Sequence, residues 1–194
     1  MDASLIIPWL SLVVLPLGWI EYKLLPRTRF ALLLVIPNTI LLYGGWGISA
    51  MSSPYSQESN LSVATGLTMV ILALILWIRS VPFTLSVPGQ LAAMPQDLVT
   101  IGAYQWSRHP IYTGHVLVIS GGILLLGARE VFLVTPILWM IAATSAWYEE
   151  HYILEPFFGE AHRSFKQRTP FLMPHWGWSL WCLVYMSVWL TILE

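Results

Sequence analysis

Residues 102–114 of this chain read Gly-Ala-Tyr-Gln-Trp-Ser-Arg-His-Pro-Ile-Tyr-Thr-Gly. This polar and aromatic stretch leads directly into an apolar run that extends to about Leu126. Proline is favoured at the first position of a helix, so Pro110 predicts a helix start there, with His109 or Ser107 as its cap. We therefore expect the stretch to lie at a membrane surface, where an apolar helix leaves the lipid.

The composition indicates a protein that is surrounded by lipid. The 194 residues are 57% hydrophobic and only 10% charged, whereas a soluble domain carries about 25% charged residues. A chain this apolar cannot bury its hydrophobic residues in one core and still present a polar surface to water. The formal net charge of −1 gives no reason to expect a nucleic-acid partner.

Apolar runs predict an all-α integral membrane protein with about five transmembrane helices. At about 1.5 Å per residue, these runs are suited to crossing the hydrocarbon layer. They cover residues 5–20, 30–50, 61–78, 111–126 and 131–147. A charged link that begins at Glu21 follows the first run, and the last two runs form an antiparallel helical hairpin.

We treat the whole chain, 1–194, as a single membrane domain. Its expected parts are three N-terminal spans (1–80), a cytoplasmic connector and cofactor loop (81–112), a helical hairpin (113–148), and a C-terminal lid with an apolar tail helix (149–194). The connector is dense in proline, which predicts irregular structure, and its length favours a functional loop. The tail helix, 176–193, either spans the membrane or lies in the interface, and its tryptophans favour the interface.

The distribution of lysine and arginine predicts the orientation in the membrane. After the expected crossings, one side carries Lys23, Arg27, Arg29, Arg79, Arg108, Arg163, Lys166 and Arg168. The opposite side carries only Arg129. Because cytoplasmic loops are rich in these residues, we expect the N-terminus outside and the polar segments in the cytoplasm.

The segment around Arg108 allows two interpretations. It suits a helix start among lipid headgroups, with the arginine reaching a lipid phosphate. It also suits an anion site, because a helix N-terminus presents free N–H groups and a positive dipole end, to which Arg108 adds a cation. Flat surfaces and hydrogen-bond donors come from Tyr104, Trp106 and Tyr112. The second interpretation predicts a ligand with a carboxylate or phosphate at one end and an aromatic ring at the other.

The residues that end the hairpin, Glu149-Glu150-His151, also allow two interpretations. They are either solvated carboxylates at a helix end or part of a site, because the hairpin returns them to the side of Arg108. In the second case Glu150 pairs with Arg108, accepts hydrogen bonds from a ribose diol, or holds an ammonium group. Aromatic and basic residues in 157–170 predict an amphipathic segment, either a lipid anchor or a lid over the site.

Several function classes lack their sequence signals. The chain has no glycine-rich dinucleotide fingerprint and no phosphate-loop lysine motif. No pair of histidines or cysteines has zinc-ligand spacing, so we expect no metal. The apolar runs carry no charged residue at mid-membrane depth, which disfavours an ion-coupled transporter.

The motifs resemble the isoprenylcysteine carboxyl methyltransferase family and its relatives among membrane phospholipid methyltransferases, in the manner of a short prokaryotic member. The resemblance covers roughly residues 90–174. The first part of the family pattern, Arg-His-Pro-x-Tyr-x-Gly, is matched by Arg108, His109, Pro110, Tyr112 and Gly114. The second part, which begins with a glutamate pair after the hairpin, is matched by Glu150, Leu154, Phe158, Gly159, Pro170 and Pro174.

The resemblance implies a transferase that binds S-adenosyl-L-methionine on the cytoplasmic side and methylates a lipophilic small molecule or lipidated group that enters from the bilayer. Arg108, His109 and Glu150 would be catalytic. The cofactor pocket would comprise Gln90, Gln96, Asp97, Leu98, Val99, Gly102, Tyr104, His109, Pro110, Ile111, Tyr112, Glu150 and Leu154. The chain departs from the pattern at Ala146, His151, His162 and Phe165, and these departures leave the acceptor open.

Two other functions fit parts of the sequence. A membrane NADPH-dependent sterol or isoprenoid reductase would have a related hairpin and lid. A non-enzymatic helical membrane protein would use the same motifs only as interface anchors among membrane lipids.

Overall fold

The computed structural model describes residues 3–24, 35–52, 60–86 and 97–193. Within these ranges the regular elements are helical and no β-strand occurs, which confirms the all-α prediction. The helices in chain order are α1 (Ala3–Leu10), α2 (Val14–Leu24), α3 (Val35–Thr39), α4 (Gly45–Met51), α5 (Asn60–Ile78), α6 (Val81–Ser86), α7 (Pro110–Leu125), α8 (Arg129–Phe132), α9 (Pro136–Glu149), α10 (Glu155–Arg168) and α11 (His175–Leu193).

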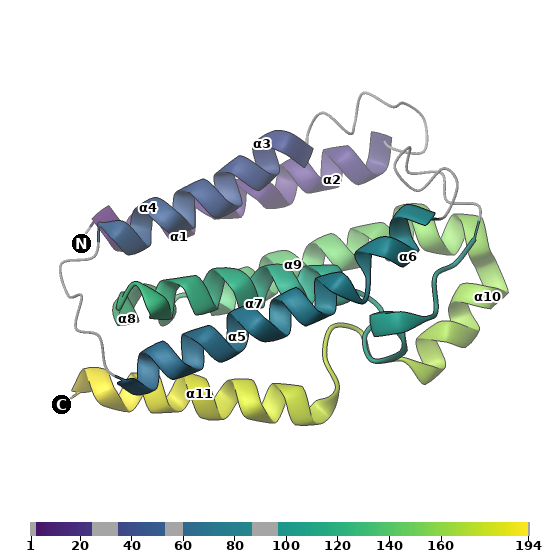
Figure 1. Cartoon of the computed structure of the whole chain (residues 1–194). Coiled ribbons are helices and arrows are strands. Elements are labelled where there is room, and N and C mark those ends of the chain that lie inside the picture. Colours follow the sequence, from purple (N-terminus) through teal and green to yellow (C-terminus); the bar gives the residue numbers. More distant parts are fainter. Residues whose placement is uncertain (1–2, 25–34, 53–59, 87–96, 194) are drawn as a thin grey trace.

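Short irregular turns join several of these helices into longer rods. A 3-10 turn at Ser11–Val13 connects α1 to α2, and a π-helical turn at Ile40–Gly44 connects α3 to α4. A second π-helical turn, Glu150–Leu154, connects α9 to α10. The helical path therefore continues past the expected end of the hairpin into the first residues of α10, and Gly159 (φ 47°, ψ −116°) then bends α10 away from the direction of α9 (Figure 1).

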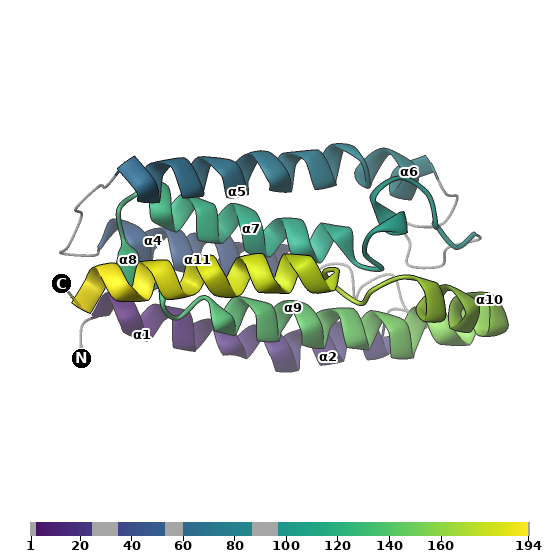
Figure 2. The ribbon, with the colours of Figure 1, turned by 90° about the horizontal axis from the view of Figure 1, so that it is seen from below.

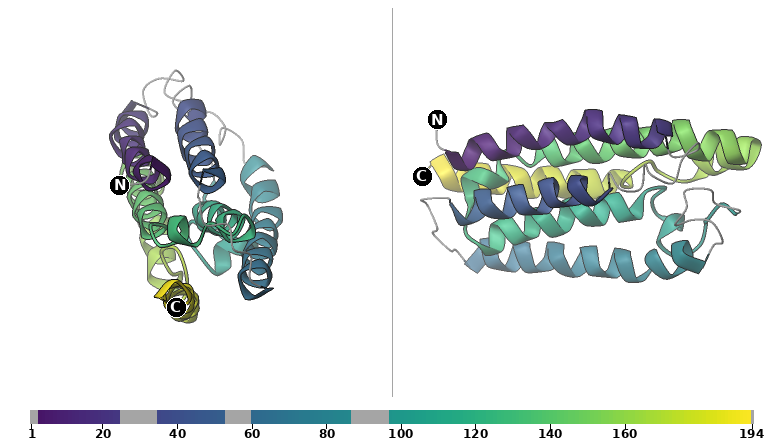
Figure 3. Two further views of the ribbon diagram at one scale, coloured as in Figure 1. Left: turned by 90° about the vertical axis from the view of Figure 1, so that its left-hand side faces the viewer. Right: turned by 90° about the horizontal axis from the view of Figure 1, so that it is seen from above.

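The rods lie side by side and form an elongated bundle (Figure 1). α6 and α10 lie at one end of the bundle, while α8 and the C-terminus lie at the other. The view along the bundle in Figure 3 shows the α1–α2 and α3–α4 rods on one side and α11 on the far side of α9. Figure 2 shows α11 running along the bundle rather than across its end.

Aromatic contacts hold α11 against the bundle. Trp181 packs against Phe132 and Trp139, with ring centroids 5.6 and 5.3 Å apart. The hydroxyl of Tyr185 donates a hydrogen bond of 2.6 Å to the carbonyl of Leu133. This lengthwise packing differs from the interfacial position that the tryptophans favoured, because the tryptophans on one side of α11 pack into the bundle.

The helices α5 and α7 make the closest packing in the fold. A Cβ placed on Gly66 would lie 2.7 Å from the carbonyl oxygen of Gly121, and one on Gly121 would lie 2.6 Å from the oxygen of Gly66. Small residues let membrane helices approach to backbone contact in this way. The close pairing brings the start of α7, which carries the Arg108 segment, against the end of α5.

Gly114 in the motif has a similar packing role. A Cβ there would lie 2.4 Å from Nε1 of Trp77, whose indole donates a 3.4 Å hydrogen bond to the carbonyl of Ile111. The glycine thus makes room for a tryptophan of α5 that holds the first turn of α7.

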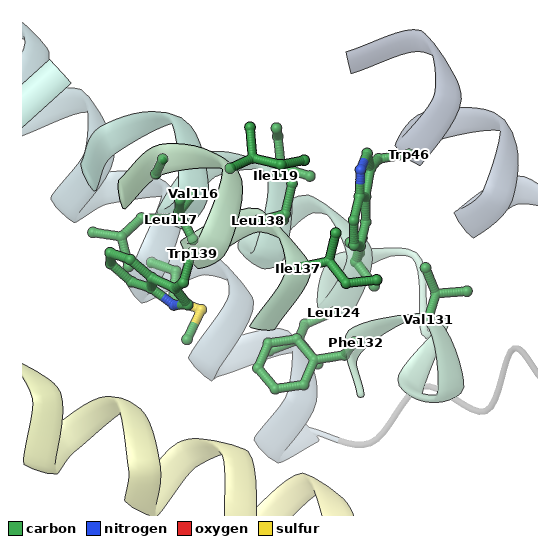
Figure 4. Close-up of a cluster of buried hydrophobic side chains, with 14 of the residues drawn as sticks. Trp46, Val116, Leu117, Ile119, Leu124, Val131, Phe132, Ile137, Leu138 and Trp139 are labelled. Atoms are coloured by element: carbon green, nitrogen blue, oxygen red, sulfur yellow. The ribbon is translucent and has the colours of Figure 1, made fainter. Parts of the chain in front are cut away.

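The apolar core lies between α7, α8 and α9, with Trp46 of α4 against it (Figure 4). Phe132, Leu124 and Val131 are completely buried there. This core fixes the hairpin whose ends carry Arg108 and Glu150.

Two helical segments are long and apolar enough to cross a membrane: residues 60–83 and 129–168. Only 22% of the most apolar window of 60–83 is buried inside the protein. Large apolar side chains such as Leu67 and Ile71 are exposed on α5. Exposed apolar surface of this kind requires an apolar environment, in agreement with the composition.

The structure corrects some expected boundaries. Residues 81–86, expected to be irregular, form the short helix α6, and the return helix α9 begins at Pro136 after the separate turn of α8. Glu21, assigned to an exposed charged link, lies inside α2 and is buried. Residues 53–59, and residues 87–96 of the expected connector, lie outside the described residues.

The α5–α7 contact gives a test of the fold. We expect Gly121→Ala to lower the unfolding free energy by about 1–3 kcal/mol, because its Cβ would press on the backbone of α5. The measurement is thermal unfolding of the purified protein in detergent, compared with Gly122→Ala. A Cβ at Gly122 meets nothing within 4 Å, so the control should be neutral or slightly stabilised. Equal unfolding temperatures for the two variants would contradict the packing.

Candidate functional site

The first turn of α7 has no capping hydrogen bond from the side chain of its N-cap residue. Pro110 occupies the first helical turn, as predicted, but the side chain of His109 makes no capping hydrogen bond. Ser107 instead accepts a hydrogen bond of 3.0 Å from the N–H of His109. His109, one of the two expected residues, therefore occupies the cap position, but its side chain makes no capping hydrogen bond, and the hydroxyl of Ser107 bonds to the turn that precedes the helix.

The segment that follows α10 lies against this turn. The N–H of Arg108 donates to the carbonyl of Pro170 at 2.9 Å, and the hydroxyl of Thr113 donates to the carbonyl of Leu172 at 2.8 Å. The ring of Phe171 lies below the guanidinium of Arg108, 5.1 Å from its central carbon. The segment from Pro170 to Leu172, about 60 positions further along the chain, thereby packs against the turn that carries Arg108.

Glu150 lies at the centre of a group of basic side chains. One carboxylate oxygen accepts a hydrogen bond of 2.6 Å from Arg108 and lies 3.0 Å from Nε2 of His109. The other oxygen lies 3.3 Å from Nζ of Lys166. The side chain of Glu150 is only 6% exposed. An ionised carboxylate loses its bound water on burial, and these three partners take the place of that water. The predicted pairing of Arg108 with Glu150 is thus present.

The pKa values follow from this arrangement. Burial raises the pKa of Glu150, but the hydrogen bond from His109 and the charges of His109, Arg108 and Lys166 outweigh it and bring the pKa below its usual value. Burial lowers the pKa of His109, but its contacts with Glu149 and Glu150 outweigh this and raise the pKa above 6.5. Burial lowers the pKa of Arg108 despite the opposing charge of Glu150. The cluster therefore favours the ionised form of Glu150 and the protonated form of His109.

A cavity of about 180 Å³ opens beside this ion cluster, between the start of α7, the connector and α10. We call it the first cavity. Its walls combine two carboxylates, one guanidinium and several apolar or aromatic side chains. They are Asp97, Leu98, Val99, Tyr104, Arg108, His109, Ile111, Tyr112, Glu149, Leu154, Phe158 and Phe165.

Most of the predicted site residues meet at the first cavity. Gly102 does not: it has φ 66°, and a Cβ there would lie 2.3 Å from the carbonyl oxygen of Arg79. Its role is to let the connector fold onto the end of α5. Pro110 is buried beneath the cavity and is not part of its wall. Gln90 and Gln96 lie outside the described residues.

Trp106 and Glu150 also lie differently from the prediction. Trp106 is about half exposed and stacks under the guanidinium of Arg79, so it is not in the wall of the cavity. Glu150 lies behind the wall, where it orients Arg108 and His109, while Glu149 faces the cavity. The helical turn decides this, because consecutive residues of a helix point about 100° apart and cannot share one face.

The sequence prediction missed three contributors to the site. Glu149 was passed over because the family glutamate was matched at position 150. Phe158 and Phe165 of α10 form the outer wall, and their seven-residue spacing on an amphipathic helix was the available signal.

His162, also on α10, is completely buried, and one ring nitrogen lies 4.0 Å from Glu150. Neither ring nitrogen has a hydrogen-bond partner among the described residues. Burial lowers its pKa, so His162 is neutral beside the carboxylate.

Comparison with known proteins places this site in a family. The family described as phospholipid methyltransferase matches residues 61–161, which is more than half of the chain. The chain belongs to the phospholipid methyltransferase family. The matched residues contain Arg108, His109, Glu149 and Glu150, while Phe165 and Lys166 lie just beyond them.

Curated relatives cover a shorter part of the chain. Protein-S-isoprenylcysteine O-methyltransferase B of Arabidopsis thaliana is 36% identical over 78 residues, which is 40% of this chain and 39% of the plant protein. Protein-S-isoprenylcysteine O-methyltransferases of mouse and rat are 34% identical over 84 residues, 40% of this chain and 27% of each relative. The similarity thus spans well under half of the length of these relatives. No solved structure gives a significant match.

The raised pKa of His109 predicts how the stability of this phospholipid methyltransferase family member depends on pH. A group whose pKa is raised by folding stabilises the fold fully below its unfolded pKa, about 6.5, and loses that contribution as the pH rises through its folded value. We therefore expect the unfolding temperature of the wild type to fall above pH 6.5. His162 acts in the opposite direction, since its pKa is lowered by folding: its contribution rises with pH up to about its unfolded value of 6.5 and levels off above it.

The matched variant for this test is His109→Asn, with unfolding temperatures measured in detergent from pH 6 to pH 9. Because asparagine does not titrate, the decline should be smaller in the variant than in the wild type. Parallel curves would show that His109 does not carry the dependence.

Proposed function

We propose that this protein is an integral membrane methyltransferase that uses S-adenosyl-L-methionine and transfers its methyl group to a lipophilic or lipid-modified acceptor. The observation that carries the proposal is the first cavity itself. In a chain of the phospholipid methyltransferase family, it unites an oriented arginine at a helix start with two carboxylates and a wall of aromatic rings.

The residues of the first cavity fit the chemical groups of S-adenosyl-L-methionine. Nε of Arg108 is buried and has no hydrogen-bond partner within the described residues. Together with the N-terminus of α7, it would bind the carboxylate of the cofactor. Glu149 and Asp97 would accept hydrogen bonds from the ammonium group or the ribose diol. Phe158 and Phe165 offer flat apolar surface for the adenine.

The charge of the cavity supports the same assignment. S-adenosyl-L-methionine carries a sulfonium, an ammonium and one carboxylate, which suits a wall that holds both the carboxylates of Asp97 and Glu149 and the basic side chains of Arg108 and His109. NADPH carries several phosphate charges and no cation, so it would bring its phosphates near Asp97 and Glu149 and offer neither carboxylate a positively charged group. This difference favours the methyltransferase over the reductase that the sequence left open.

Each residue of the ion cluster then has a definite role. Glu150 is a positioning residue: its carboxylate pairs with both Arg108 and His109 and fixes the orientation of their side chains. Lys166 closes α10 over the cluster through the second oxygen of Glu150. Phe158 and Phe165 exclude water from the cavity. The bound cofactor supplies an electrophilic methyl group, and the chain contributes alignment of the two reactants, from which much of the acceleration of such a displacement comes.

The proposal includes the placement in the membrane. The whole chain forms one multi-pass domain with the N-terminus outside and the α10 end, which carries the first cavity, facing the cytoplasm. Lysine and arginine concentrate at that end, which supports the orientation. About five spans follow from the hydropathy, and the lengthwise packing of α11 favours a sixth.

Calorimetric titration of the detergent-purified protein with S-adenosylhomocysteine tests the cofactor assignment, with NADPH titrated in parallel. We expect saturable binding of the first ligand and none of the second. Arg108→Ala should weaken binding at least about tenfold, because it removes a charge-assisted hydrogen bond to the ligand carboxylate. Arg163→Ala is the matched control, since that arginine is 58% exposed and pairs only with Glu155 and Glu160.

Two other results of these titrations would contradict the cofactor assignment. Binding of NADPH alone would move the protein to the reductases. Binding of neither ligand by folded protein would leave the interpretation of the motifs as interface anchors.

A further inference from the structure

A second cavity of about 180 Å³ lies inside the bundle, between α2, the α3–α4 rod, α7 and α9. Tyr112 forms part of the wall of both cavities. Its hydroxyl is hydrogen-bonded to that of Tyr22, which also lines the second cavity. One pair of tyrosines therefore lies between the first cavity and a second cavity that is lined by helices of the bundle.

The second cavity is polar at one end and apolar at the other. Glu21 and Asn38 line it near the first cavity, whereas Val14, Ile119 and Leu138 line its other end. Val14 and Glu21 are seven residues apart on a helix, which corresponds to about 10 Å along its axis. Such a cavity matches an amphiphile that points its head toward the first cavity and its apolar chain into the bundle.

The polar end presents hydrogen-bond acceptors. Nδ2 of Asn38 donates to one oxygen of Glu21 at 3.1 Å, and the side chain of Glu21 is buried. Oδ1 of Asn38 is buried and has no partner among the described residues. Within the same described part of the chain, no lysine or arginine forms an ion pair with Glu21. A buried carboxylate next to an unsatisfied carbonyl oxygen favours a group that donates hydrogen bonds and carries positive charge.

An amine meets this requirement better than the alternatives. A protonated amine has up to three N–H donors and can satisfy Glu21 and Asn38 together, whereas a hydroxyl has one donor. A carboxylate head would leave Oδ1 of Asn38 unsatisfied, because it offers no hydrogen-bond donor. The size of the cavity also limits the ligand. An apolar cavity of about 150 Å³ holds one benzene molecule, so this one has room for one chain and not for two.

We propose that the second cavity is the acceptor site, and that Glu21 and Asn38 select a single-chain lipophilic amine over a carboxylate. The bound ammonium would first give a proton to the carboxylate of Glu21, because only the neutral amine has a lone pair. Its nitrogen would then form the new N–C bond as the S–C bond of the cofactor breaks, which leaves S-adenosylhomocysteine. The inference rests on the proposed methyltransferase function and names the acceptor class for it. This acceptor class differs from the isoprenylcysteine after which the curated relatives are named.

Photolabelling in the absence of any methyl donor tests the acceptor site. The protein is placed in phosphatidylcholine nanodiscs with a single-chain amine that carries a diazirine in mid-chain, or with the carboxylic acid of the same chain. Labelled residues are identified by peptide mass spectrometry. We expect the amine to label Ile119 or Leu138 saturably, and to do so about tenfold more than the acid.

Two variants check the residues. Glu21→Gln should lower labelling by the amine about tenfold, because a hydrogen bond to a charged group is lost, while the bond from Asn38 can remain. Glu160→Gln makes the same chemical change at a position that is 83% exposed and should leave labelling unchanged. Ala142→Phe, which fills the apolar end, should abolish it.

The outcomes separate this inference from the proposed function. Titration of the same preparations with S-adenosylhomocysteine shows whether each variant is folded and whether the first cavity binds its ligand. If that ligand binds but the acid labels as well as the amine, or Glu21→Gln has no effect, the acceptor assignment is overturned alone. Labelling of lipid-facing Leu67 or Ile71 in place of Ile119 and Leu138 would overturn it too. Failure of S-adenosylhomocysteine to bind the wild type would overturn the proposed function itself.

Discussion

The site depends on one buried carboxylate. Glu150 is removed from water at the end of a long apolar helix and keeps its charge only because Arg108, His109 and Lys166 surround it. These partners come from two segments that are far apart in the chain. The ion cluster therefore joins the start of α7 to α10, and both of these segments contribute residues to the wall of the first cavity. Without these partners the charge would be costly to bury, and the contact of Lys166 that ties α10 to the cluster would be lost.

A division of roles between neighbouring residues follows from helical geometry. Glu149 faces the first cavity and is available to a ligand, while Glu150 faces the bundle and organises the arginine. The same geometry places Tyr112 between two cavities of different character. In the function that we propose, the polar cofactor would bind in the first cavity and the lipophilic acceptor in the second. The methyl transfer that we propose would take place where they meet.

The sequence predicted the parts of this arrangement that local rules control. Pro110 predicted the start of α7, and the hairpin predicted that Glu150 returns to Arg108, because two antiparallel helices of similar length must end side by side. The π-helical turn at Glu150–Leu154 was not predictable in this way. It rotates α10 relative to α9, and the direction of a helix face after such a turn depends on tertiary packing. For the same reason the sequence assigned the cavity-facing role to Glu150 and not to Glu149. The burial of Glu21 was missed because its partner Asn38 is on another rod.

The direct continuation of α9 into α10 links the lid to the lipid environment. From Pro136 to Phe158 the chain follows one helical path through the apolar region, and Gly159 (φ 47°, ψ −116°) then bends α10 over the first cavity. A transmembrane helix adjusts its tilt when the hydrocarbon thickness of its bilayer changes. In this protein such a tilt would be transmitted through the π-helical turn to Phe158 and Phe165, which form the outer wall of the cavity. The closure of the site, and with it the proposed turnover, would then vary with the acyl-chain length of the host membrane.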